Sequence, residues 1–88
     1  VSGQNKIENI GDLIIYPNPA REELQVYLPS LNEEALYSIK NIQGQEVLNG
    51  KILPNGEVNK IGLNQSKGIY FIEINTKTKH LVKKFSVL

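Results

Sequence analysis

The stretch that decides the fold is Gly68-Ile69-Tyr70-Phe71-Ile72-Glu73-Ile74-Asn75. In an extended chain, successive side chains point to opposite faces of the sheet. Tyr70, Ile72 and Ile74 therefore share one face. Ile69 and Phe71 share the other, so both faces are largely apolar and rich in β-branched and aromatic residues. This composition predicts a strand at the centre of a sheet with a packed layer on each side.

The residues that follow predict a hairpin that closes the domain. Residues 75–79 form a polar turn, and residues 80–88 return as a second strand. Gly68, at the start of the first strand, marks a corner where a positive φ or a close neighbour is expected.

The last strand departs from simple alternation. Phe85 and Val87 share a face with Leu81, but that face also includes Lys83. Two explanations stay open: Lys83 lies at a sheet rim and extends its ammonium group to water, or a bulge near Val82 resets the register. Lysines on an edge strand also discourage edge-to-edge aggregation.

The preceding chain predicts five more short strands, over residues 13–16, 23–28, 35–41, 45–53 and 57–63. Pro17-Asn18-Pro19 ends the first of them, because two prolines remove two main-chain donors, and it can turn a corner between sheets. Residues 41–44 form a turn in which Gly44 can take a positive φ. Asn49-Gly50 is either a tight hairpin turn or a bulge. We favour the bulge, because residues 54–56 supply a better turn just beyond.

Seven short strands separated by turn signals, with no helical periodicity, predict an all-β fold. The expected architecture is an immunoglobulin-like antiparallel β-sandwich. The paired Cys and buried Trp of antibody domains are missing, and the strand order cannot be derived. Residues 1–12 are polar and fit either a linker or a frayed end, which leaves 13–88 as the domain.

Length and composition exclude several classes of function. The chain has 88 residues, which is enough for one domain with a thin core and little room for a deep pocket. Its net charge of +1 does not indicate nucleic-acid binding, and the absence of Cys excludes disulfides and thiolate metal sites. No apolar run reaches the ~20 residues that span a bilayer, so no membrane insertion is predicted. Because the chain begins with Val1 rather than Met and has no signal peptide, we interpret it as a fragment of a longer protein that retains that protein's C-terminus at Leu88.

Residues that could carry chemistry do not converge in the sequence pattern. His80 is the only histidine and is expected at the surface. The pairs Glu22-Glu23 and Glu33-Glu34 are adjacent on extended chain, so their side chains point apart. We therefore predict no catalytic residue, no metal ligand and no cofactor, and thus no enzyme. Among the four tyrosines only Tyr27 is predicted to face outward from the middle of a strand, where it could stack on a sugar.

The order and spacing of several motifs resemble one known family. These motifs are Ile15-Tyr16-Pro17-Asn18-Pro19-Ala20, the strand Leu24-Gln25-Val26, Tyr37-Ser38-Ile39-Lys40-Asn41-Ile42-Gln43-Gly44-Gln45-Glu46-Val47, Gly68-Ile69-Tyr70-Phe71-Ile72-Glu73-Ile74 and Lys83-Lys84-Phe85-Ser86-Val87-Leu88. Together they resemble the type A C-terminal sorting domain of the type IX (Por) secretion system of Bacteroidetes, over residues 13–88.

The resemblance implies a function that the residues alone do not reveal. Such domains end secreted cargo proteins, are recognised in the periplasm by shuttle and translocon proteins, and pass to the outer-membrane surface or the outside of the cell. A cell-surface sortase usually removes them, and the cut would fall within or before residues 1–12. The oligomeric state stays open.

The residues that match the family's recognition motifs are Pro17, Asn18, Pro19, Gly44, Gly68, Tyr70, Lys83, Lys84, Phe85 and Val87. A terminal strand with an open edge would let a receptor pair with main-chain groups, and its lysines would add charge specificity. The same Pro, Gly and Tyr residues can also be explained as corners and core. Two other functions remain open: a sugar-binding or adhesive sandwich module of a cell-surface protein, and a passive spacer.

Overall fold

A computed structural model of the chain describes residues 13–29, 31, 33–53 and 58–88. These residues form seven strands and no helix: β1 (Ile14–Tyr16), β2 (Glu23–Tyr27), β3 (Ala35–Asn41), β4 (Glu46–Ile52), β5 (Asn59–Gly62), β6 (Gly68–Asn75) and β7 (His80–Val87). The predicted all-β class is confirmed. The predicted linker over 1–12 and the turn at 54–56 lie outside the described residues.

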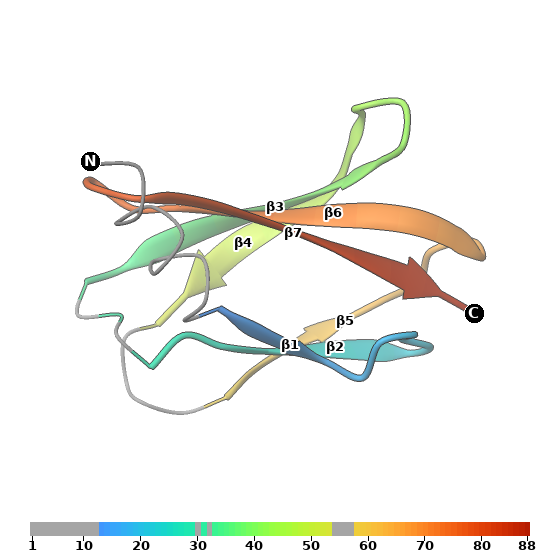
Figure 1. Cartoon of the computed structure of the whole chain (residues 1–88), viewed down its shortest axis with the longest axis horizontal. Coiled ribbons are helices and arrows are strands. Elements are labelled where there is room, and N and C mark those ends of the chain that lie inside the picture. The colour runs from blue at the N-terminus through green and yellow to red at the C-terminus, as the bar shows by residue number, and fades with distance from the viewer. Residues whose placement is uncertain (1–12, 30, 32, 54–57) are drawn as a thin grey trace, which may run out of the picture.

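The strands form two antiparallel sheets that pack face to face, as Figure 1 shows. One sheet has the order β1-β2-β5 and the other the order β4-β3-β6-β7. The predicted β-sandwich is therefore confirmed. The strand order differs from that of an immunoglobulin constant domain, because β4 pairs with β3 instead of extending the first sheet.

The core between the two sheets is built by alternation along the strands. In β2, Leu24 and Val26 are fully buried while the residues between them are half-buried. In β3, Ala35 and Ile39 are buried, whereas Leu36 is 57% exposed. Every fully buried side chain in the described part of the chain is apolar, so the layers are held together by the hydrophobic effect.

The position of β6 was predicted correctly, but its two-sided burial was not. β6 lies between β3 and β7, and Tyr70, Ile72 and Ile74 face the core. Ile69 is 39% exposed and Phe71 is half-buried, because nothing in the described chain covers the outer face of this sheet with a third layer. A domain this small packs two layers, and the second apolar face of β6 is left at the surface.

Neither prediction for Asn49-Gly50 is right. β4 runs straight through these residues, with Ser38 opposite Asn49 and Tyr37 opposite Gly50. The bulge lies further back, where the register shifts between Ile39–Leu48 and Lys40–Glu46. Gly50 has a packing role instead: a Cβ placed there would lie 2.7 Å from the Tyr37 ring. The ring occupies the space that any larger side chain would need.

The bulge proposed near Val82 is also absent. The register of β6 and β7 is continuous from Gly68–Val87 to Asn75–His80, which confirms the predicted hairpin. Its turn is closed by Thr76, whose hydroxyl oxygen accepts hydrogen bonds from the N–H groups of Thr78 and Lys79.

The described residues include no helix that could span a membrane.

Candidate functional site

The corner at residues 17–20 lies against the end of β7. The N–H of Ala20 donates to the carbonyl of Ser86 (2.8 Å), and the N–H of Leu88 donates to the carbonyl of Ala20 (2.9 Å). The Oδ1 of Asn18 accepts from the N–H of Ser86 at 3.1 Å. We call this contact between Asn18–Ala20 and Ser86–Leu88 the terminal seam. It joins two motifs that lie at opposite ends of the sequence.

The prolines on either side of Asn18 shape this corner. Pro17 and Pro19 are exposed, and the Tyr16–Pro17 and Asn18–Pro19 peptide bonds are both cis. Ala20, immediately after them, is fully buried and forms a parallel bridge with Val87. A shallow groove of about 460 Å³ runs beside the corner and is lined by Pro17, Pro19, Arg21, Glu22, Glu23 and Gln25.

Two of the predicted aromatic residues form the buried side of the same end. Tyr70 lies opposite Phe85 in the register, and their rings stack with centroids 5.9 Å apart. The Tyr70 hydroxyl donates to the carbonyl of Ser66 at 2.7 Å. Both rings are buried, so they position the terminal strand and are not available for direct contact with a partner.

The two glycines among the predicted site residues, Gly44 and Gly68, both lie at this end of the sandwich. Gly68 pairs with Val87 and has a φ of 155°, and Gly44 has a φ of 85°, so both glycines take the positive φ expected of them. Gly44 lies in the β3–β4 turn, where its N–H donates to the carbonyl of Asn41. Asn41 pairs with Tyr70, so this turn lies at the same end of the sandwich as the seam, as Figure 1 shows.

The two lysines of β7 point to opposite faces. Lys83 lies on the inner face and is half-buried, and its Nζ donates to the carbonyl of Leu13 at 3.1 Å. Lys84 is exposed on the outer face, opposite Phe71. Of the two explanations for Lys83, the bulge is excluded, and the rim position holds with the ammonium group bonded to a carbonyl of the domain.

The edge of β7, expected to be open, is partly occupied. β7 is an edge strand, but the terminal seam occupies its last residues, and the Lys83 side chain reaches Leu13 beside it. Sequence reasoning missed the roles of Ala20, Ser86 and Leu13. The one available signal was a small apolar residue, Ala20, directly after Pro17-Asn18-Pro19. It did not indicate which strand Ala20 would contact.

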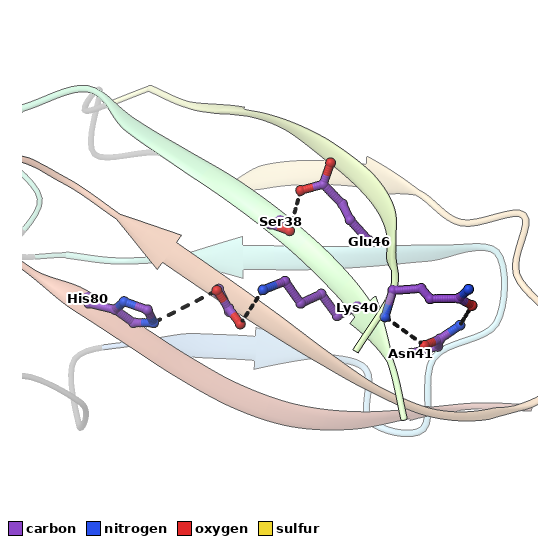
Figure 2. Close-up of polar contacts among 7 residues, drawn as sticks. Ser38, Lys40, Asn41, Glu46 and His80 are labelled. Atoms are coloured by element: carbon purple, nitrogen blue, oxygen red, sulfur yellow. Dashed lines mark hydrogen bonds and ion pairs between the residues drawn. The ribbon is translucent and has the colours of Figure 1, made fainter. Parts of the chain in front are cut away.

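Several polar contacts lie on the outer face of the larger sheet (Figure 2). The Glu73 carboxylate lies between the Nζ of Lys40 at 3.1 Å and the Nε2 of His80 at 3.8 Å. Glu46 accepts hydrogen bonds from the Ser38 hydroxyl at 2.7 Å and the Asn49 amide at 2.8 Å. These two bonds, the first above all, hold the pKa of Glu46 below its ordinary value, and nearby Lys40 adds to the effect.

The titratable groups of these polar contacts lie at the surface or in ion pairs. The carboxylates are exposed or paired, and the His80 side chain is 59% exposed. Among the described residues, no group of three or more His, Cys, Asp or Glu side chains could hold a metal ion.

The tyrosines are arranged differently from the prediction. Tyr27 is half-buried on the outer face of the smaller sheet, but it does not stand alone there. Tyr16, which is 39% exposed, shares that face, as does Ile14, which lies opposite Tyr27.

Known proteins are similar to this domain in sequence and in fold. A family model described as "Secretion system C-terminal sorting domain" matches residues 14–88. Among solved structures, dimeric latent PorU from Porphyromonas gingivalis is similar, with a TM-score of 0.56 and 23% identity. That match covers 88% of this chain but only 9% of the PorU chain, and at this identity it shows the fold alone. No curated protein matches the chain significantly.

The family match includes all seven strands and both halves of the terminal seam. It confirms the resemblance drawn from the sequence motifs. Domains of this family are C-terminal secretion signals of the type IX system, whose cargo is exported to the cell surface or outside the cell. The chain belongs to the family of secretion system C-terminal sorting domains.

Proposed function

We propose that this domain is a non-catalytic signal that shuttle and translocon proteins read in the periplasm, at the end of the sandwich where the terminal seam lies. A cell-surface sortase then removes it, cutting before the first strand. The domain itself performs no chemistry on the cargo. The candidate recognition surface is formed by Pro17, Asn18, Pro19, Gly44 and Lys84. Buried or half-buried residues of β6 and β7 hold this surface in place: Gly68, Tyr70, Lys83, Phe85 and Val87.

The observation that carries this proposal is the terminal seam. Three hydrogen bonds of 2.8–3.1 Å place the Pro17–Pro19 corner directly beside the end of β7. A receptor that contacts this end therefore meets both motifs at once. Because the two motifs are separated in sequence, they form one surface only in the folded domain, and the fold becomes part of the signal.

A division of roles among the residues also supports the proposal. Tyr70, Phe85 and Val87 are buried and hold the terminal strand in place, whereas Pro17, Asn18, Pro19 and Lys84 are exposed. Exposed residues held by a rigid scaffold are suited to contact a partner.

The test is a fusion in a type IX host. Residues 1–88 are attached to the C-terminus of a periplasmic reporter, and the reporter on the cell surface is measured by protease accessibility in intact cells. We expect surface reporter in the host and periplasmic reporter in an isogenic strain that lacks the translocon. Periplasmic retention in the competent host, with the domain folded and protease-resistant, would reject the proposal.

A second function is favoured by the outer face of the smaller sheet. Tyr16 and Tyr27 share this face beside the groove that Pro17 and Gln25 line, and aromatic rings next to amide groups suit sugar binding. Glycan-array binding that disappears in Tyr27→Ala, and that is weakened in Tyr16→Ala, would support an adhesive module. An array with no binding would exclude it.

A further inference from the structure

The direction of the main-chain groups along β7 defines a short stretch of open edge. In an antiparallel pair, alternate residues turn their N–H and C=O groups away from the partner strand. Ser86 does so, because both of its groups bond to Asn18 and Ala20 rather than to β6. Lys84 and Val82 follow at intervals of two, so their main-chain groups also face away from β6. The described residues supply no main-chain partner for either.

The side chains along this edge are basic and apolar. Val82 is 41% exposed and Lys84 is exposed, and both stand on the outer face. Residues 76–88 contain four lysines and no acidic residue. Glu73, on the neighbouring strand, is already paired with Lys40 and His80, and Lys84 forms no ion pair with another described residue.

Lys83 differs from Lys84 in both its direction and its partner. Its side chain leaves the inner face, and its ammonium group donates to the carbonyl of Leu13, the residue immediately before β1. The bond fixes the entry of the chain beside β7. Lys83 is therefore a positioning residue, and it is not presented to a partner.

We propose that the type IX partner binds by adding a short extended segment along Val82 and Lys84, with an acidic side chain set against Lys84, while Lys83 stays inside the domain. This inference rests on the proposed function and names the chemistry of the partner. Edge addition provides main-chain hydrogen bonds, and the opposed charge selects the partner. The segment is short, because the terminal seam closes the edge from Ser86 onward.

The experiment uses the reporter fusion in the type IX host. Lys84→Glu should lower the exported fraction roughly ten-fold or more, because like charges at an interface repel strongly. Lys84→Met should lower the exported fraction less than Lys84→Glu does, and Lys84→Arg should be exported like the intact fusion. The matched control is Lys60, an exposed lysine of β5 in the smaller sheet: Lys60→Met and Lys60→Glu should be exported like the intact fusion.

A second pair of variants tests the main-chain contact. Val82→Pro removes an N–H that faces the open edge, a position where an edge strand tolerates proline, and it should reduce export. Val82→Thr keeps that N–H and should be exported normally. Folding of every variant is checked by limited proteolysis of the same fusion, isolated from the strain that lacks the translocon.

The outcomes separate this inference from the proposed function. If the intact fusion is not exported, the proposed function fails. If the intact fusion is exported and folded Lys84→Glu is exported equally well, only the edge inference is overturned. It is also overturned if folded Lys60→Glu is as defective as Lys84→Glu. Light scattering that shows a dimer of the intact fusion and a monomer of Lys84→Glu would assign the edge to a second copy instead.

Discussion

The side-chain Oδ1 of Asn18 accepts a hydrogen bond from the main-chain N–H of Ser86 at 3.1 Å, although 68 positions separate the two residues. The bond joins the corner after β1 to the strand that ends the domain, and two main-chain bonds of Ala20 reinforce it. The beginning and the end of the folded unit therefore depend on each other. A local change at the corner is expected to reach the terminal strand.

Asn18→Ala removes the acceptor for Ser86 and should lower the free energy of unfolding by about 0.5–1.5 kcal/mol. Asn18→Asp keeps an acceptor oxygen and should lose less. Urea denaturation measures both variants, and hydrogen exchange of the Ser86 amide should accelerate in Asn18→Ala. Unchanged stability together with unchanged exchange at Ser86 would show that the bond contributes nothing.

Phe85→Ala should lower the free energy of unfolding by about 3–5 kcal/mol, because Phe85 is fully buried and stacks on Tyr70. Phe71→Ala is the matched control on the adjacent strand. Its ring lies half-buried on the outer face, so its loss should cost clearly less. Thermal or urea unfolding of the pair decides the matter, and equal losses would contradict the assignment of the two faces.

Gly50→Ala should destabilise the domain by about 1 kcal/mol or more, because the new Cβ would overpack against the Tyr37 ring. Removing the ring in Tyr37→Ser should abolish that penalty in the double variant.

Gly62→Ala is the control for this glycine. A Cβ placed at Gly62 would meet nothing within 4 Å, and the φ of Gly62 is not positive, so the change should stabilise by about 0.4–1 kcal/mol. Urea unfolding of Gly50→Ala, Tyr37→Ser and the double variant measures the coupling free energy between positions 50 and 37. A stabilising Gly50→Ala would refute the role given to the Tyr37 ring.

Ser38→Ala should raise the pKa of Glu46 toward its ordinary value, because the Ser38 hydroxyl is the main cause of the lowered pKa. A carboxyl whose pKa is lower in the folded state stabilises the fold above its unfolded pKa. That contribution disappears as the pH falls through the lowered value. An NMR titration of the Glu46 carboxyl carbon in both proteins measures the change. An identical midpoint in Ser38→Ala would contradict it.

The features predicted from sequence are those that local alternation encodes. The burial of Tyr70, Ile72 and Ile74 and the hairpin of β6 and β7 follow from which face each side chain must occupy. The positive φ of Gly44 likewise follows from its place in a turn. Such features need no knowledge of distant partners.

The features that sequence reasoning missed depend on contacts between distant segments. Nothing near Ala20 shows that it will meet Ser86, and nothing near Gly50 shows that the Tyr37 ring will fill its space. The unlike roles of Lys83 and Lys84 arise because β7 faces Leu13 on one side only. For the candidate site, the sequence motifs identified the residues. Only the strand topology shows which of these residues lie together.

The most direct test of a C-terminal signal is its placement within the reporter fusion. The domain is attached after the reporter in one fusion and inserted between two reporter domains in another, and surface reporter is measured in the same type IX host. A signal read at the terminal seam predicts export of the first fusion and periplasmic retention of the second. Equal export of both fusions, or retention of the first, would contradict the account.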